Sequence, residues 1–312
     1  SLRHEAARAA VEKLNAADRA IAIYLSLIDE DPHDDEAVKN LVALYETGGR
    51  RQDLLDLKRR LVGSAKDLRG RLHIRLEVAP LEDELGSVDK AIEALRENLS
   101  ESGRHEATVK MLAQFLQREE RKSELETLLA SQAELAERAE DKKIASDFFQ
   151  RAAEVAEKQM SDLPRAIGHL RRVVSLEERT NAYDALARLS TETKAFDEAA
   201  GFLDRLRELT DGKERAAVNL RLSDALVAAN RKAEARAKLE AEVARDPDAD
   251  SVRIRLAETY RAAQDWPALA LLLTEGAHHA PDKALRLARL REAAELHRRM
   301  NEPEKAIPLL EQ

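Results

Sequence analysis

The stretch Lys90–Leu95 reads KAIEAL and decides how the chain folds. It places a small residue, Ala91, four positions before a large apolar residue, Leu95. Residues four apart share one face of a helix, so the stretch predicts a helix with a small and a large residue on its buried face. Copies of the pattern lie at Arg19–Tyr24 (RAIAIY), Arg165–Leu170 (RAIGHL), Lys305–Leu310 (KAIPLL) and, in a weaker form, Glu234–Leu239 (EARAKL).

A second version of the pattern lies between these copies, often with leucine in the place of the alanine. We call the residue at this place the anchor of its helix. The nine anchors are Ala20, Leu54, Ala91, Leu125, Ala166, Ala199, Ala235, Leu269 and Ala306. Neighbouring anchors lie on average about 36 residues apart, within the range of known helical repeats. A spacing held over nine anchors indicates an internal repeat.

Each repeat contains two helical patterns. Apolar residues at every third or fourth position across 38–45 predict a helix with one apolar face. Gly48-Gly49 ends this helix, because glycine tolerates the positive φ common at helix ends. A second apolar stripe follows across 54–61. The unit is therefore a helix–turn–helix, which we call a helical pair with a first and a second helix.

The prolines agree with this arrangement. Pro164, Pro267 and Pro303 fall where second helices begin, a position that tolerates a missing N–H. Pro80 instead lies inside a first helix, which predicts a kink near 76–80. A further group of prolines lies at one common distance after an anchor, where the second helix must end: Pro32, Pro247 and Pro281.

A helix–turn–helix of about 34 residues with these marks resembles the tetratricopeptide repeat. The matching features are the alanine anchor, the large residue four positions later, the Asp-Pro ends at Asp31-Pro32 and Asp246-Pro247, and the aromatic residues Phe196 and Trp266 that open second helices. The resemblance covers the whole chain. It implies an all-α fold, an α-solenoid of stacked helix–turn–helix pairs in a right-handed superhelix.

The anchors also show a longer period. The alanine anchors of the first pattern recur at every second repeat, which predicts two unequal helical pairs as the larger unit, as in long bacterial tetratricopeptide arrays. The interval from Leu125 to Ala166 is the longest between neighbouring anchors and predicts longer helices across 122–160. We expect one solenoid of about nine helical pairs over 1–312, with a sub-domain boundary near 139–143 as the alternative.

Composition excludes several classes of protein. Charged residues make up 36% of the 312 residues and aromatic residues 3%, which is typical of helices and not of a β-sandwich. The chain has no cysteine, which excludes disulfides, thiolate chemistry and zinc–thiolate sites. No apolar run approaches the roughly 20 residues that a membrane-spanning helix needs, so we expect no membrane insertion. A net charge of −8 without a basic excess argues against nucleic acid as a ligand. The cytoplasm and the periplasm both remain open, with the cytoplasm favoured.

Motifs for catalysis or cofactor binding are missing from the sequence. It contains no glycine-rich phosphate loop, no GxSxG and no HExxH. His278-His279 and His297 could in principle hold a metal, but adjacent histidines on a helix point about 100° apart, so we expect no metal site. The acidic run Asp29–Glu36 is explained by helix capping, and Trp266 by core packing. We therefore expect neither an enzyme nor a cofactor.

Function must then come from the surface. In stacked repeats the first helices line the concave side, and in the resembled family this groove holds a peptide or a partner's helix. The register selects Lys39, Glu46, Lys110, Gln114, Asn181, Asp184, Arg188, Glu258, Arg261, Arg291, Glu295 and Arg298 as groove residues. Arg291 and Arg298 lie on one face, which is either solvated or a patch for an anionic partner.

The first hypothesis is thus a non-catalytic scaffold that binds a protein or peptide along the groove. The alternative is a regulatory sensor that binds a peptide or small ligand. No polar capping helix closes either end of the repeats, and open arrays need polar caps. We therefore expect a longer parent chain, or self-association through the uncapped ends.

Overall fold

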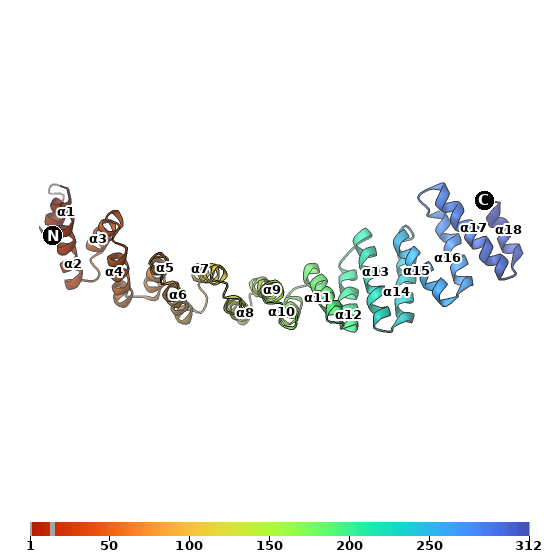
Figure 1. Ribbon diagram of the computed structural model, residues 1–312, viewed down its shortest axis with the longest axis horizontal. Coiled ribbons are helices and arrows are strands. Elements are labelled where there is room, and N and C mark those ends of the chain that lie inside the picture. The colour runs from red at the N-terminus through yellow and green to blue at the C-terminus, as the bar shows by residue number, and fades with distance from the viewer. Residues whose placement is uncertain (1, 13–15, 312) are drawn as a thin grey trace. The chain divides into compact units, whose positions relative to one another are not determined.

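Figure 1 shows the computed structural model of the chain, which describes residues 2–12 and 16–311. These residues form eighteen α-helices and no β-strand, which confirms the predicted all-α fold. The chain divides into two compact units, Ser1–Glu140 and Asp141–Gln312. Each unit is described by itself below.

The helices follow one another as first and second members of helical pairs. The first helices are α1 (Leu2–Glu12), α3 (Asp35–Thr47), α5 (Leu68–Glu84), α7 (Glu106–Arg118), α9 (Lys142–Lys158), α11 (Thr180–Glu192), α13 (Gly212–Ala228), α15 (Asp250–Ala263) and α17 (Lys283–Arg299). The second helices are α2 (Ala17–Glu30), α4 (Arg51–Ser64), α6 (Val88–Ser102), α8 (Lys122–Arg138), α10 (Leu163–Leu176), α12 (Phe196–Glu208), α14 (Lys232–Arg245), α16 (Trp266–His278) and α18 (Pro303–Leu310).

Every anchor is the fourth residue of a second helix. None of the nine is more than 4% exposed, so the register predicted from the spacing is confirmed. The large residue four positions later is buried as well in most pairs, as Leu95 and Leu170 show. The two exceptions are Lys58 in α4, which replaces an apolar residue, and Leu310 in α18, which is 59% exposed.

The first helices alternate in length. Helices α3, α7 and α11 have 13 residues and α15 has 14, whereas α5, α9, α13 and α17 have 17. This alternation confirms the longer period of two unequal pairs. The predicted lengthening across 122–160 is confirmed too, because α8 and α9 have 17 residues each.

The turn inside each pair has one backbone conformation in common. In the eight turns that the structure describes, the residue five positions before the anchor has a positive φ: Gly49, Gly86, Glu120, Ser161, Lys194, Asn230, Gln264 and Asn301. In seven of them, the N–H of the next residue donates to the carbonyl five positions earlier, as Arg50 does to Tyr45 over 2.8 Å. This bond ends the first helix in the Schellman manner. The turn of the first pair includes residues 13–15, outside the described residues.

The prolines lie where the sequence predicts. Pro164, Pro267 and Pro303 occupy the first turns of α10, α16 and α18. Helix α5 continues through Pro80 to Glu84, so the proline does not end it, and the kink near 76–80 stays a prediction. Pro32, Pro247 and Pro281 follow the ends of α2, α14 and α16.

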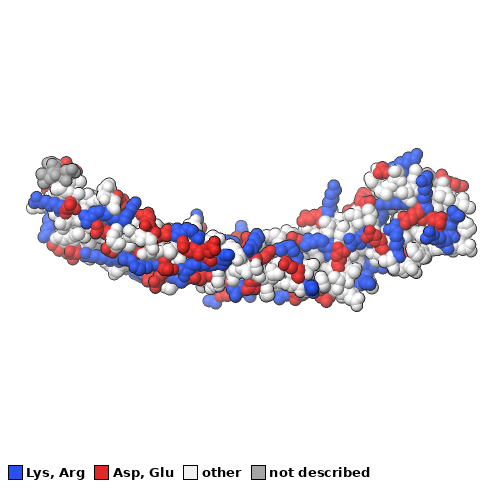
Figure 2. All heavy atoms as spheres, viewed as in Figure 1, with Lys and Arg blue, Asp and Glu red and all other residues white. Residues whose placement is uncertain are grey.

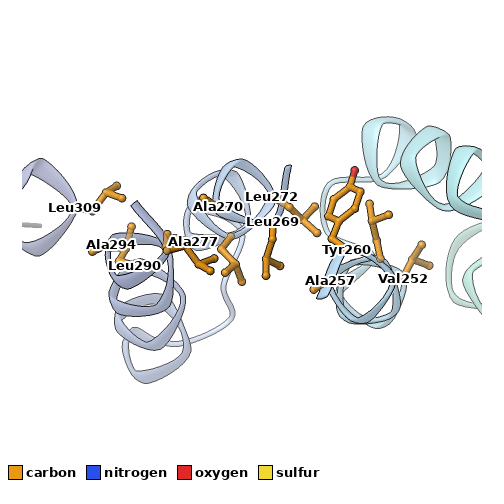
Figure 3. Packing of buried hydrophobic residues seen from close by; sticks show 14 of the residues in the cluster. Val252, Ala257, Tyr260, Leu269, Ala270, Leu272, Ala277, Leu290, Ala294 and Leu309 are labelled. Carbon is orange, nitrogen blue, oxygen red and sulfur yellow. The ribbon is translucent and has the colours of Figure 1, made fainter. Parts of the chain in front are cut away.

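The buried core of the second unit combines large and small side chains. Tyr260 of α15 and Leu269 and Leu272 of α16 belong to one cluster, together with the small residues Ala257 and Ala270 (Figure 3). Trp266 is half-buried and packs against this cluster, as its expected core role requires.

The acidic run Asp29–Glu36 caps helices, as predicted. Asp34 is the N-cap of α3, and its carboxylate accepts a hydrogen bond from the N–H of Ala37 over 3.0 Å. This cap satisfies an amide group that the first helical turn leaves unpaired. In the turn between α2 and α3, the carboxylate of Asp31 accepts from the N–H of His33 over 3.0 Å.

Candidate partner-binding surfaces

Arginine–carboxylate pairs join the first helices of the second unit into a row, which we call the arginine ladder. The pairs, with the helices that they join, are Glu157–Arg188 (α9–α11), Asp184–Arg221 (α11–α13), Asp224–Arg255 (α13–α15) and Arg261–Glu292 (α15–α17). The Arg188 and Arg261 pairs have N–O distances of 2.7 Å. Pairs this exposed add little stability each.

Three of the twelve predicted groove residues belong to the ladder: Asp184, Arg188 and Arg261. Three more pair within their own helix. Glu258 lies 3.3 Å from the Nε of Arg255, and Glu295 lies 3.5 Å from Arg298. The structure thus brings half of the predicted residues into ion pairs within the chain.

The side chains of the other six predicted residues make no hydrogen bond or ion pair with the described part of the chain. These residues are Lys39, Glu46, Lys110, Gln114, Asn181 and Arg291. All six are exposed and lie on first helices of the two units. Their polar groups are therefore available to a partner.

The first unit has a related contact that the sequence did not single out. Arg118 on α7 donates to both carboxylate oxygens of Asp83 on α5, over 2.5 and 2.7 Å. The guanidinium also lies 5.1 Å from the ring centre of Phe115. Hydrogen bonds from Arg118 hold the pKa of Asp83 below its ordinary value.

Hollows lie along the second helices. One of about 410 Å³ is lined by residues of α14, α15 and α16, and we call it the α14–α16 hollow. A second of about 480 Å³ lies beside α16 and α18, and a third of about 520 Å³ lies on α6 next to Arg121. None of the twelve predicted groove residues lines these three hollows. They are a separate candidate surface.

Two buried arginines, Arg253 in α15 and Arg289 in α17, belong to the helices around the α14–α16 hollow. Arg289 donates to the carbonyl of Gly276 over 2.7 Å and pairs with Asp250. Arg253 is 3% exposed and lines the hollow. Sequence reasoning missed both, although a charged residue inside an apolar helical stripe, as in Val252-Arg253, is a visible signal.

The three histidines considered for a metal are not gathered at one site. His279 Nδ1 lies 2.9 Å from Asp248, and His297 Nδ1 lies 2.8 Å from Glu302. Within residues 2–12 and 16–311, no group of three or more potential ligands is arranged to hold a metal ion. No helix in the same ranges is long and apolar enough to cross a membrane.

Figure 2 shows how charge is distributed on one face of the molecule. Lysine and arginine alternate with aspartate and glutamate along it. This mixture agrees with the numerous ion pairs between neighbouring helices.

Known proteins resemble this chain in structure and not in sequence. No family model and no curated protein sequence matches the chain. Among solved structures, YrrB, described as a TPR protein with an unusual peptide-binding site, aligns at 13% identity and a TM-score of 0.34, over 53% of this chain and 82% of its own. A tetratricopeptide repeat protein from Parabacteroides merdae aligns at 12% identity and a TM-score of 0.32, over 86% of this chain and 98% of its own.

PilF of Pseudomonas aeruginosa aligns at 15% identity and a TM-score of 0.34, over 64% of this chain and 86% of its own. Superpositions this loose say nothing about function. The evidence for the fold is in the chain itself: the repeat length, the nine buried anchors and the common turn. By these features the chain is an array of tetratricopeptide-like helical pairs.

Proposed function

We propose that the chain is a non-catalytic scaffold that binds a segment of a partner protein. It binds through the first-helix face, by which we mean the surface of the first helices that carries the twelve predicted groove residues. The observation that carries the proposal is the division of this face into two kinds of side chain. Ion pairs such as Arg188–Glu157 join successive first helices of the second unit. On the same helices, side chains such as Asn181 and Arg291 remain exposed and unpaired. A partner can thus form polar contacts without breaking these ion pairs.

The unpaired residues also indicate the character of the partner segment. In the first unit, Lys39 and Lys110 are cationic, Glu46 is anionic and Gln114 is an amide. In the second unit, Arg291 is cationic and Asn181 is an amide. The unpaired side chains of each unit therefore favour an extended segment that is acidic on balance, and the amides can bond to its main chain. Rim charges of this kind act on association rate and specificity more than on affinity, so binding should weaken as salt rises.

The test is affinity capture with a charge-reversed face. The variant Lys110→Glu/Arg291→Glu removes two unpaired cations from first helices. The control, Lys90→Glu/Lys232→Glu, makes the same change of charge at exposed, unpaired positions on second helices. Quantitative mass spectrometry should show loss of the partner with the first variant and retention with the control. Equal recovery with both variants contradicts the proposal.

A further inference from the structure

The α14–α16 hollow has a large exposed apolar side chain at its edge. Two positions after the anchor, second helices carry a charge in α4 and α6 (Asp56 and Glu93) or a small or polar residue in α8, α10 and α12 (Thr127, Gly168 and Gly201). Helix α16 has Leu271 at this position, and its side chain is 60% exposed at the edge of the hollow. The neighbouring helix α14 exposes two small apolar residues, Ala237 and Ala241. Exposed apolar side chains beside a concave, largely apolar hollow make it a candidate interaction site.

The hollow has walls that suit an apolar side chain. Val243 and Pro247 come from α14 and the turn after it, Leu256 from α15, and Leu272 from α16. Its volume of about 410 Å³ falls within the range of roughly 300–1,000 Å³ common for ligand sites.

A buried cation lies at the wall of this hollow. The Arg253 side chain is 4% exposed, and its Nη2 donates to the carbonyl of Pro247 over 2.5 Å. Its Nε and Nη1 donate no hydrogen bond to any described residue. The nearest carboxylate, Asp250, is 3.7 Å from Nη1 and is already paired with Arg289. Two buried guanidinium groups therefore share one carboxylate, and a second carboxylate would complete the cluster.

The other charged groups around the hollow are already engaged or stay at its rim. Glu240 accepts from the hydroxyl of Tyr260 over 2.8 Å and from Arg236 over 2.7 Å. His279 bonds to Asp248, while Glu275 and His278 lie at the rim. Burial, and then the nearby charge of Arg289, lower the pKa of Arg253, which agrees with a cation short of anionic partners.

We propose that the α14–α16 hollow binds a partner segment that inserts a large apolar side chain next to a glutamate, whose carboxylate pairs with Arg253. Because Nε and Nη1 are buried in the free chain, pairing with this carboxylate requires the guanidinium to turn toward the hollow. A glutamate side chain suits this place better than a chain end, because its backbone stays at the rim in water. A buried chain end would bring its own peptide groups into an apolar space without partners. The site is independent of the first-helix face.

The test uses capped peptides and the whole chain. The probe is fluorescein-labelled Ala-Leu-Glu-Leu-Ala amide, and its reference replaces glutamate by glutamine, which has the same shape without the charge. Fluorescence anisotropy should show binding of the glutamate peptide about tenfold tighter, the discrimination of one charge-assisted hydrogen bond. Equal affinity for the two peptides, or no binding of either, overturns the proposal. Tighter binding of Ala-Leu with a free carboxyl end overturns the choice of a side-chain carboxylate.

Variants of the chain locate the binding. Leu271→Ser should weaken both peptides, because it removes the exposed apolar contact. The control is Ile254→Ser on α15, since Ile254 is 51% exposed but does not line the hollow. Arg253→Met should abolish the preference for glutamate over glutamine and leave the apolar contact. An unchanged affinity in Leu271→Ser, or a preserved preference in Arg253→Met, contradicts the proposal. If Arg253→Met does not fold, the peptide pair on the unmodified chain still decides.

Discussion

Gly276 in α16 provides the space that the Arg253 side chain of α15 fills. A Cβ atom on Gly276 would lie 2.5 Å from Cδ of Arg253 and 2.8 Å from its Nε. The glycine lies in the last turn of α16, where any other residue would bring its Cβ atom against Arg253. The pair explains how a long cationic side chain is accommodated inside a helical core.

We expect Gly276→Ala to destabilise the chain by about 1–3 kcal/mol, because the methyl group must displace a packed guanidinium. The controls are Gly168→Ala and Gly201→Ala, where an added Cβ has nothing within 4 Å. These two variants should be more stable than the parent by up to about 1 kcal/mol, because alanine has a higher helix propensity than glycine. Thermal or urea unfolding measures both effects, and a Gly276→Ala variant as stable as the controls would contradict the packing.

The buried alanine anchors should not tolerate a larger side chain. Ala91 and Ala166 are 0% exposed, so Ala91→Leu or Ala166→Leu should overpack the helix crossing at a cost of about 1–3 kcal/mol. Ala237→Leu, on the exposed face of α14, is the control and should change stability little. A melting temperature of either anchor variant equal to that of the parent would reject the register.

The common turn predicts a stabilising substitution. Lys194 has a φ of 61°, a conformation that is costly for a residue with a Cβ and free for glycine. Glycine also makes the unfolded chain more flexible, which offsets part of this gain. Lys194→Gly should therefore raise the free energy of unfolding by about 0.5–1 kcal/mol. Lys194→Ala keeps the strain and serves as control. If urea denaturation finds the glycine variant less stable than the alanine variant, the turn is wrongly described.

The Arg118–Asp83 pair predicts a dependence of stability on pH. Because the pKa of Asp83 is lower in the folded state than in the unfolded chain, the pair stabilises the fold above about pH 4. This contribution is lost as pH falls through the lowered pKa. Asp83→Asn should therefore be less stable than the parent at pH 7, and the difference should shrink as the pH falls from about 4 through the lowered pKa. A difference that stays constant across this range in urea titrations would exclude the pair as its source.

The fold could be predicted because its signals are local. An anchor such as Ala166 and the large residue Leu170 lie on one helix, and their spacing is visible in the sequence. The arginine ladder could not be predicted in the same way, because its ion pairs depend on how one helical pair is rotated against the next. Its partners lie 31–37 residues apart, about one repeat, so opposite charges at that separation are the signal to look for.

The α14–α16 hollow could not be predicted for a similar reason. It depends on residues from three helices, and on Gly276, whose role is visible only once Arg253 is placed beside it. The sequence was sufficient to place the twelve predicted groove residues on first helices. It could not separate those that pair internally, such as Arg188, from those that stay free, such as Lys110.

Lysine footprinting of the chain in complex with its captured partner tests the central proposal most directly. Acetylation of exposed amines should be suppressed by the partner at Lys39 and Lys110 on the first helices. Lys90 and Lys232 on the second helices should be modified equally with and without the partner. Protection of Lys90 and Lys232, with Lys39 and Lys110 still fully modified, would contradict binding through the first-helix face.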